Sequence, residues 1–195
     1  MLKKLSLISA SAISAFAMHT AEINVNDTDL EIGAKLDIAQ FNNTTEPDTI
    51  FTGVRFLHAT DKNSDFAKGT IKDFYELNFL MKREVSTSPL AIGLGVKLNH
   101  TESFTTIPLG VELSYKLPAG DVIPLYLSGS LYYAPEVLSM ENAKNFLEYR
   151  VSFDMEVIEH GNITVGYRSI QTNYVARDMS YNKSAYIGFK FAFLN

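Results

Sequence analysis

The sequence contains no cysteine among its 195 residues. This absence excludes a disulfide-stapled scaffold, thiolate metal ligands and a cysteine nucleophile. Positive charge is also scarce: 17 Lys and Arg against 22 Asp and Glu give a net charge of −5, which argues against a nucleic-acid-binding protein. Beyond the N-terminus, no run approaches the roughly 20 apolar residues of a membrane-spanning helix. Yet 46% of the residues are hydrophobic and the mean hydropathy is +0.00, so the apolar residues must be distributed in some regular way.

The first 17 residues have the features of a secretory signal peptide. Lys3 and Lys4 provide a positively charged start, residues 5–16 are apolar or small, and Ala15-Phe16-Ala17 forms an A-x-A cleavage site. The apolar stretch is too short to span a membrane as a helix. We therefore expect residues 1–17 to be removed on export across a bacterial inner membrane, and residues 18–195 to form one mature domain.

Through the rest of the chain, apolar residues alternate with small or charged ones. A period of two places each apolar set on one face of a β-strand. The alternation is clear in five segments and weaker in five, which predicts ten strands, or eight if two of the weak segments are not strands. The clear segments are residues 92–98, 107–117, 147–157, 163–172 and 185–193, and the weaker ones are 30–41, 50–59, 74–85, 122–133 and a short first one at 18–26.

The expected strands are long, and their connections alternate in length. Most strands cover roughly 9 to 14 residues, whereas strands of soluble proteins average about 5–6 and a tilted membrane-spanning strand needs about 9–11. Short turns on one side and long loops on the other are typical of outer-membrane barrels. If the long loops face outward, the C-terminus is periplasmic, and an even number of strands places the N-terminus there too. The short turns fall at 86–88, 118–121 and 159–161, and the long loops at 61–72, 99–106, 134–145 and 173–182.

The second face of the strands carries glycines and charges, which favours a membrane barrel over a soluble one. A soluble barrel points its apolar face inward, and a membrane barrel reverses this arrangement. A narrow lumen needs charges of both signs that can pair, and glycines that leave them room, such as Gly93, Gly95, Gly110 and Gly166. The predicted lumen charges are Glu76, Lys97, Glu112, Glu148, Arg150, Asp154, Glu156, Arg168 and Lys190.

The hairpins allow a test of strand pairing, because a slip of one residue would move every side chain to the wrong face. A two-residue turn at 86–87 would pair Met81 with Ile92. On the other face it would place Glu76 directly across from Lys97, and opposite charges in such a pair contribute roughly 0.2–1 kcal/mol. This register keeps the apolar faces of both strands together.

Two further hairpins pass the same test. One turns around residues 118–122. The other has a three-residue loop at 159–161 with Gly161 in the left-handed conformation. The expected pairs are Tyr115 with Leu125 in the first of these hairpins and Val157 with Ile163 in the second.

Several motifs of the mature chain are similar to those of one protein family. On these motifs, which are spread over most of the mature chain, the sequence resembles the YfaZ family of bacterial outer-membrane proteins. The resemblance implies a signal-bearing outer-membrane β-barrel, and it supplies no catalytic residues because the family has no established activity. The motifs are Tyr132-Tyr133-Ala134-Pro135-Glu136-Val137-Leu138, Phe146-Leu147-Glu148-Tyr149-Arg150, Gly166-Tyr167-Arg168, Ile107-Pro108-Leu109-Gly110-Val111 and Asn182-Lys183-Ser184-Ala185-Tyr186.

Little in the sequence indicates catalysis. Asp154 and Glu156 share the polar face of one strand, and paired carboxylates can act as acid and base, but ion pairing with basic lumen residues is the favoured explanation. His58 and Ser64 are the candidates if the protein modifies lipids. The sequence has no phosphate-binding glycine loop and no metal-ligand spacing, so we expect no cofactor.

The loop at 134–145 and the C-terminal segment carry local signals of their own. Pro135 ends the preceding strand, and Ser139 is placed to cap a short helix over 140–144. We expect an ordered loop that closes the outer end of the barrel, with a surface recognition element as the alternative. The alternating segment Phe189-Lys190-Phe191-Ala192-Phe193 resembles the aromatic tail by which insertion machinery recognises outer-membrane proteins.

These observations predict an all-β, antiparallel up-and-down transmembrane β-barrel in the outer membrane. We expect a non-enzymatic protein with a charged lumen, either structural or adhesive or a very narrow channel, because ten strands enclose little space compared with 16-stranded porins. The alternatives are an outer-membrane lipid-modifying enzyme and a soluble periplasmic lipocalin-like binder of hydrophobic ligands. The expected partners are outer-membrane lipid and the insertion machinery, without nucleic acid, and the number of subunits stays open.

Overall fold

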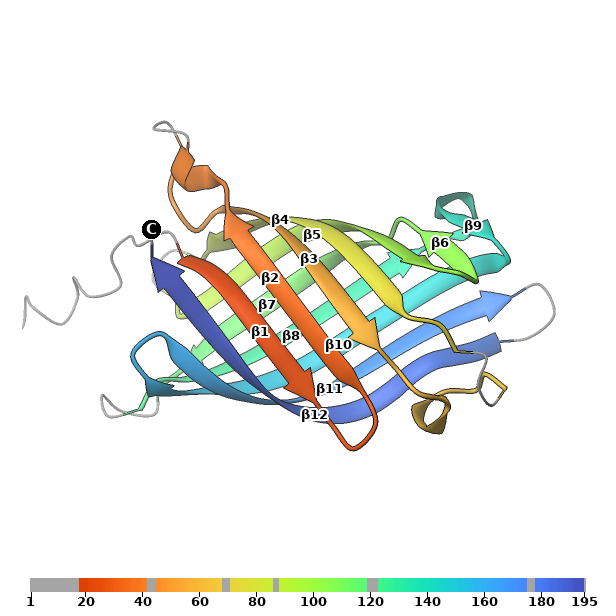
Figure 1. The fold of residues 1–195 in the computed structure, drawn as a ribbon. Helices are drawn as coiled ribbons and strands as arrows, with labels where there is room; N and C mark the ends of the chain where they lie inside the picture. The colour runs from red at the N-terminus through yellow and green to blue at the C-terminus, as the bar shows by residue number, and fades with distance from the viewer. Residues whose placement is uncertain are drawn as a thin grey trace, which may run out of the picture.

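A computed structural model describes residues 18–41, 45–67, 71–85, 88–118, 123–174 and 178–194. Within these ranges ten long strands form one closed antiparallel barrel, which confirms the predicted fold (Figure 1). Each strand pairs with its neighbour in the sequence, and the first pairs with the last. The expected signal peptide, residues 1–17, lies outside the described residues. The strands are β1 (Met18–Val25), β2 (Leu30–Asp37), β3 (Ile50–His58), β4 (Phe74–Glu84), β5 (Leu90–Thr101), β7 (Leu109–Leu117), β8 (Leu125–Ala134), β10 (Ala143–Ile158), β11 (Gly161–Tyr174) and β12 (Asp178–Leu194).

The first and last strands place both chain ends at one end of the barrel, which we call the terminal end. Met18 pairs with Leu194 there, on the left of Figure 1. The opposite end, which we call the loop end, carries three long connections with short elements of their own. These are η2 (Asp61–Asn63) between β3 and β4, β6 (Phe104–Thr106) between β5 and β7, and η3 (Glu136–Leu138) with β9 (Ser139–Glu141) between β8 and β10. A further short helix, η1 (Ala39–Phe41), lies in the connection between β2 and β3 at the terminal end.

The helix expected after Ser139 is wrong. The hydroxyl of Ser139 donates back to the carbonyl oxygens of Ala134 and Pro135, so it does not cap a following helix. Residues 139–141 instead form β9, which pairs with β6 over Thr106↔Ser139 and Phe104↔Glu141. The paired strand satisfies backbone groups that a five-residue helix would leave largely unpaired. No helix among the described residues is long and apolar enough to span a membrane.

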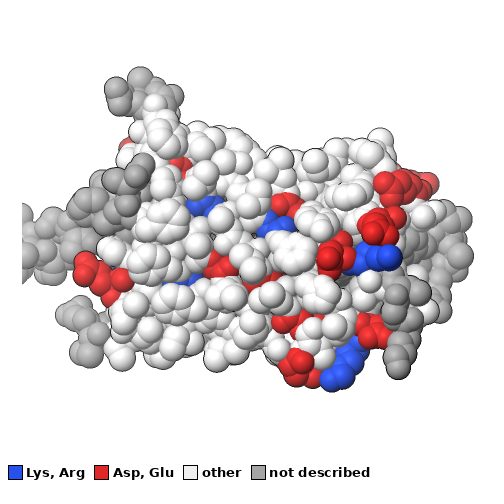
Figure 2. Space-filling view, in the orientation of Figure 1, with Lys and Arg blue, Asp and Glu red and all other residues white. Residues whose placement is uncertain are grey.

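The two faces of the barrel have opposite character. Val54, Leu77, Leu94, Val165 and Ile187 point outward from five strands, and each is more than half exposed. Figure 2 shows a largely uncharged outer face, with the largest groups of charged side chains at the loop end. The inward positions of the same strands carry most of the buried charged and polar residues. This polarity is the reverse of a soluble barrel, so the protein is an outer-membrane β-barrel with an apolar belt facing lipid.

The observed hairpins keep the predicted faces but differ from the predicted registers by two residues. Between β4 and β5, Met81 pairs with Leu94 and not with Ile92. The ladder closes where the N–H of Val85 donates to the carbonyl of Leu90, over 2.8 Å. Pro89 has no N–H to donate toward β4, so the paired part of β5 begins one residue later and the turn is longer than predicted.

The second hairpin, between β7 and β8, is longer for the same reason. Tyr115 pairs with Leu127, not with Leu125. Leu125 pairs with Leu117, and prolines 118 and 124 flank the turn on both sides. Because neither proline can donate a ladder hydrogen bond, the pairing ends before both of them.

The third hairpin, between β10 and β11, has a different turn from the one expected. Met155 pairs with Ile163, where Val157 was expected, and a bulge lies between Glu156 and Ile158. His160, not Gly161, has the positive φ of 63°. Gly161 serves another purpose: a Cβ there would lie 2.8 Å from Cδ1 of Ile158, so only glycine allows this close approach.

Candidate functional site

The lumen contains a buried cluster of ion pairs, which we call the central ion network. Arg55 of β3 lies at its centre, with its guanidinium contacting Glu76 of β4 and lying 2.7 Å from Glu148 of β10 and 3.5 Å from Glu31 of β2. Lys97 of β5 lies 3.2 Å from Glu76 and 3.1 Å from Glu148. All five side chains are buried. The network therefore joins strands from opposite walls of the barrel.

Two further arginines complete the central ion network. Arg150 of β10 donates to both carboxylate oxygens of Glu31, at 2.8 and 2.7 Å. Arg168 of β11 lies 3.1 Å from Glu31 and 3.5 Å from Asp29. Its Nε also donates to the side-chain oxygen of Asn182, over 2.9 Å. Four acidic and four basic side chains thus balance one another, as buried charges require.

Aromatic rings cover the cations of this network and rest on glycines. Lys97 Nζ lies 3.9 Å from the centre of the Tyr132 ring, and the Tyr132 hydroxyl donates to Glu112 over 2.7 Å. A Cβ at Gly95 or Gly110 would collide with that ring. The absence of side chains at these glycines therefore lets a large ring lie flat inside a narrow barrel.

Nearer the terminal end, two ion pairs of the lumen are more exposed. Lys35 lies 3.3 Å from Glu112, and their side chains are 35% and 26% exposed. Lys190 lies 3.1 Å from Asp154, and its side chain is 29% exposed. The side chains of the central ion network nearer the loop end are almost entirely buried. Because these pairs point inward yet contact solvent, water reaches the lumen from the terminal end.

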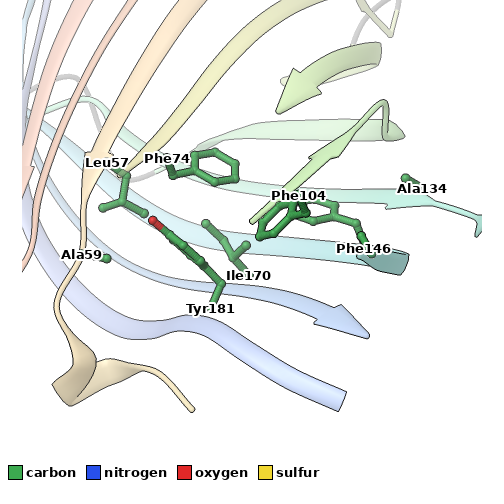
Figure 3. Packing of buried hydrophobic residues seen from close by; sticks show 9 residues of the cluster. Leu57, Ala59, Phe74, Phe104, Ala134, Phe146, Ile170 and Tyr181 are labelled. Atoms are coloured by element: carbon green, nitrogen blue, oxygen red, sulfur yellow. The ribbon is translucent and has the colours of Figure 1, made fainter. Parts of the chain in front are cut away.

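On the loop side of the network, the lumen is filled by an apolar plug. On four strands the plug residue lies two positions closer to the loop end than a network residue, so the plug covers the network directly. Phe74 stacks against Phe146 with ring centres 6.4 Å apart, and Phe104 contacts both Phe146 and Tyr181 (Figure 3). The plug consists of Leu57, Ala59, Phe74, Phe104, Ala134, Ala143, Phe146, Ile170 and Tyr181.

A β-bulge directs Tyr181 into the plug. Ile170 pairs with Asn182, whereas the next residue, Gln171, pairs with Ser180, so Tyr181 is the extra residue of β12. Its side chain is buried and its hydroxyl donates to the carbonyl oxygen of Lys72 in the β3–β4 connection. The bulge thus re-aims one side chain and ties the connection to the barrel wall.

Asp29, in the turn between β1 and β2, holds three segments together at the loop end. Its carboxylate accepts hydrogen bonds from Asn26, Asn63 and Asn182 at 2.9–3.0 Å and from the backbone N–H of Thr60 at 3.1 Å. Burial opposes ionisation of Asp29, but these hydrogen bonds outweigh it and lower its pKa from the usual value near 4 to about 2. An ionised carboxylate therefore fastens the β3–β4 connection to the β1–β2 turn and to β12.

The structure places the nine predicted lumen charges in three groups. Five of them lie together in the central ion network. Glu112, Asp154 and Lys190 form pairs nearer the terminal end. Glu156 lies apart, at the β10–β11 hairpin, where it accepts from the backbone N–H of His160 over 3.3 Å. The five network members are Glu76, Lys97, Glu148, Arg150 and Arg168.

Sequence reasoning missed several charged residues of the lumen, four of which are paired in the sites described above. Asp29, Glu31, Lys35 and Arg55 come from the weakly patterned segments around 30–41 and 50–59. A signal was present, because Glu31, Lys35 and Arg55 alternate with apolar neighbours just as the predicted charges do. Glu76 and Lys97 do form an ion pair, but diagonally, since Lys97 is directly opposite Asn78.

The residues considered for catalysis are not brought together. His58 lies 2.7 Å from Asp73 on the outer surface, whereas the Ser64 hydroxyl donates to the carbonyl of Ser180 over 3.1 Å. Asp154 accepts from Thr164 and pairs with Lys190. Across the part of the chain that the structure describes, no three His, Cys, Asp or Glu side chains are arranged to hold a metal ion.

Comparison with known proteins identifies one matching family and several similar solved structures. The model of the YfaZ family, described as YfaZ precursor, matches residues 2–193. No curated protein sequence matches the chain. Among solved structures, a KdgM porin is 8% identical, with 90% of this chain and 99% of that chain covered at a TM-score of 0.45. The same porin in complex with disordered oligogalacturonate gives a TM-score of 0.46 at 8% identity and the same coverage. The outer-membrane channel DcaP of Acinetobacter baumannii is 10% identical over 88% of this chain and 54% of that one, at a TM-score of 0.42.

Proposed function

Since the chain belongs to the YfaZ family and folds as an outer-membrane β-barrel, we propose that it acts as a sealed barrel and not as an open diffusion pore. The observation that supports this most strongly is that two successive layers fill the lumen. Glu31, Glu148 and Arg168 of the central ion network are fully buried, as are Phe74 and Phe146 of the plug. A solute crossing the barrel would have to displace both a neutralised set of charges and a dry aromatic layer.

The proposed role is structural or adhesive, with the loop end as the surface that the cell presents. Strands β6 and β9 extend the sheet at that end, and the β3–β4 connection is fastened there to the β1–β2 turn and to β12. A very narrow channel is the second candidate. It is supported by the partly exposed pairs Lys35–Glu112 and Lys190–Asp154, which lie on the terminal side of the central ion network.

We propose no catalytic activity. Asp73 orients His58, but the Ser64 considered as its partner bonds elsewhere, and the carboxylates of the lumen are engaged by basic side chains. A lipocalin-like binder would need an apolar cavity and a polar outer face, which is the opposite of the arrangement seen. Neither alternative therefore has a feature that favours it.

The proposed partners are outer-membrane lipid, through the apolar belt, and the insertion machinery, through β12. Phe189, Phe191 and Phe193 of β12 all point outward and are partly exposed. This aromatic row is accessible to a protein that pairs with the last strand during insertion. Export by residues 1–17 remains a prediction of the sequence.

Planar-bilayer recording of the refolded chain tests the sealed barrel. The wild-type protein is expected to insert without stable conductance steps. Phe104→Ala combined with Lys97→Ala, which removes one ring from the plug and one cation from the central ion network, is expected to produce measurable openings, while Phe153→Ala on the lipid-facing side is the control. Folding of each variant is checked by heat-modifiable mobility on a gel. Stable wild-type steps of porin size would overturn the proposal.

A further inference from the structure

A second site lies outside the barrel, at the loop end of β3, β4 and β5. It is a pocket of about 350 Å³, which we call the rim pocket. Tyr75 pairs with Phe56 on one side and with His100 on the other, so all three point outward. Two residues further along β4, Leu77 already belongs to the apolar belt, so the rim pocket lies where the belt ends, at the level of lipid headgroups. Its polar and aromatic lining consists of His58, Lys72, Asp73, Tyr75, His100 and Glu102.

The charged side chains of the rim pocket give it a net negative charge. Lys72 Nζ lies 3.0 Å from Oε2 of Glu102, so these two charges balance. Asp73 adds a further negative charge, and no lysine or arginine of the described residues forms an ion pair with it. Just outside the lining, Glu141 adds another, where it accepts from the hydroxyl of Thr105 over 3.1 Å. The electrostatically complementary ligand is therefore a cation.

His58 contributes a hydrogen-bond acceptor to the rim pocket. Its Nδ1 lies 2.7 Å from Oδ1 of Asp73, and both side chains are more than a third exposed. A carboxylate can only accept, so Nδ1 carries the proton and Nε2 of the neutral ring keeps a lone pair. Because Asp73 uses only Oδ1 in this contact, its Oδ2 is a second acceptor at the same place.

His100 contributes an acceptor in the same way. Its Nδ1 lies 2.8 Å from the hydroxyl of Thr105, and that hydroxyl donates its only proton to Glu141. The imidazole must then donate to Thr105 through Nδ1, which leaves the lone pair on Nε2. Within the described residues, neither Nε2 has a hydrogen-bond partner. His58 and His100 belong to the strands on either side of β4, so these acceptors line the rim pocket from both sides.

These groups match a primary ammonium better than other cations. An ammonium has a positive charge and three N–H donors, which suit the two imidazole nitrogens and the second oxygen of Asp73. Tyr75 adds the face of a ring, held 5.3 Å from the ring centre of Phe56, and such a face attracts a cation. A quaternary ammonium has no N–H and is recognised by cages of several rings, whereas the lining has one phenol ring. In the described part of the chain, no three His, Cys, Asp or Glu side chains are placed to hold a metal ion.

We propose that the rim pocket binds a primary ammonium group carried by the headgroup of a membrane lipid. The lining supplies the complementary charge, the neutral imidazoles and Asp73 accept the N–H groups, and Tyr75 supplies an amphipathic wall on the side of the apolar belt. A free primary amine shares this chemistry and is the second source of such a ligand. Because the rim pocket lies outside the lumen, the proposal is independent of whether the barrel is sealed.

Native mass spectrometry of the refolded full chain tests this proposal. The barrel is released at about pH 8, where imidazoles are ordinarily neutral, from nanodiscs of phosphatidylethanolamine and phosphatidylcholine in equal parts. The wild-type protein is expected to retain phosphatidylethanolamine about fivefold over phosphatidylcholine. The double variant D73N/E102Q is expected to lose this preference, because it removes both negative charges from the lining. D27N, which removes an exposed carboxylate paired with Lys62 outside the rim pocket, is the matched control and should keep it.

Free amines separate the two sources and keep the test decisive if D73N/E102Q folds poorly. Ethanolamine or choline is added to the wild-type protein in phosphatidylcholine nanodiscs, and the imidazole nuclear magnetic resonance signals of His58 and His100 are followed. Together with the lipid preference, a response to ethanolamine indicates a site for the ammonium alone, and a response only to phosphatidylethanolamine indicates a headgroup site; both support the proposal. Equal retention of the two lipids by the wild type, an unchanged preference in D73N/E102Q, or equal responses to ethanolamine and choline would overturn it.

Discussion

At the scale of single residues, glycines decide where the large rings of the lumen can lie. Tyr132 covers Lys97 and reaches Glu112 only because Gly95 and Gly110 have no side chains beneath it. The ring in turn shields the ammonium group from the rest of the lumen, which strengthens the attraction between Lys97 and its carboxylates. A side chain added at either glycine would therefore displace the Tyr132 ring and disturb its contacts with Lys97 and Glu112.

Gly110→Ala is expected to destabilise the barrel by roughly 1–3 kcal/mol, because overpacking a filled interior forces side chains or backbone to move. The new Cβ would lie 2.5 Å from the Tyr132 ring and closer still to the carbonyl oxygen of Leu131. The measurement is the urea midpoint for loss of heat-modifiable mobility in detergent. Gly129→Ala is the matched control, because its Cβ would meet only the carbonyl of Arg150 at 3.8 Å. Equal effects of the two substitutions would contradict the packing described.

Glu148→Gln is expected to cost about 3–5 kcal/mol, because it leaves Arg55 and Lys97 with too little negative charge in a buried place. Adding Lys97→Met to that variant is expected to recover part of the loss, since the uncompensated cation is then removed. A double-mutant cycle in the free energy of unfolding measures this coupling. Strictly additive losses would show that Glu148 and Lys97 do not act as a pair.

At the scale of elements, the β3–β4 connection is held by hydrogen bonds that converge on one carboxylate. Asn63 and the backbone of Thr60 belong to the connection, Asn26 to the β1–β2 turn and Asn182 to β12, and all four donate to Asp29. Asp65 and Ser180 exchange two more hydrogen bonds, at 2.9 and 2.8 Å. These bonds fasten the connection to the β1–β2 turn and to β12.

The lowered pKa of Asp29 makes this fastening sensitive to strong acid. Because the folded protein holds the pKa at about 2, against a usual value near 4, the ionised form contributes stability above about pH 4 that is lost as pH falls through about 2. The contribution is about 2 kcal/mol. Asp29→Asn is expected to lack it, so the difference in unfolding free energy between wild type and variant should shrink across this range. Asp27→Asn, in the same turn but exposed, is the control. A difference that stays constant with pH would contradict this role of Asp29.

At the scale of the whole molecule, the lumen is asymmetric along its axis. Toward the terminal end the inward-facing Lys35, Glu112 and Lys190 are partly exposed, although Asp37, Phe51 and Leu80 of β2–β4 are buried there, whereas toward the loop end the inward-facing side chains are fully buried. The physical cause is composition: serines and glycines line the first part, and aromatic residues fill the second. Water is therefore expected to enter from one side only.

The absence of natural cysteine makes this asymmetry measurable with single introduced thiols. Ser128→Cys, in the half-buried part, is expected to react with a small water-soluble maleimide about a hundredfold faster than Thr172→Cys, which is fully buried. Adding Phe104→Ala to Thr172→Cys should raise its rate by opening the plug. Equal rates for the two single variants in lipid vesicles would mean that the lumen is not closed at the loop end.

How far the sequence predicts this molecule depends on the range of the interaction involved. Alternation assigned most residues to the correct face, and even the weak segments at 18–26, 30–41 and 50–59 proved to be strands. It could not assign the register, because a period of two is unchanged by a shift of two residues. The turns set the register instead, because prolines 89, 118 and 124 have no N–H to donate to a neighbouring strand.

The sequence by itself determined an outer-membrane barrel with its charges inside and left eight or ten strands open, because strand length and polarity are local properties that each segment carries independently. Only the tertiary structure decided which charges meet. Arg55 and Glu148 lie on β3 and β10, far apart in the sequence, and they contact only because closing the sheet brings opposite walls within reach of two side chains. The apolar plug arises in the same way, since Phe74, Phe104, Phe146 and Tyr181 become neighbours only around a closed circumference.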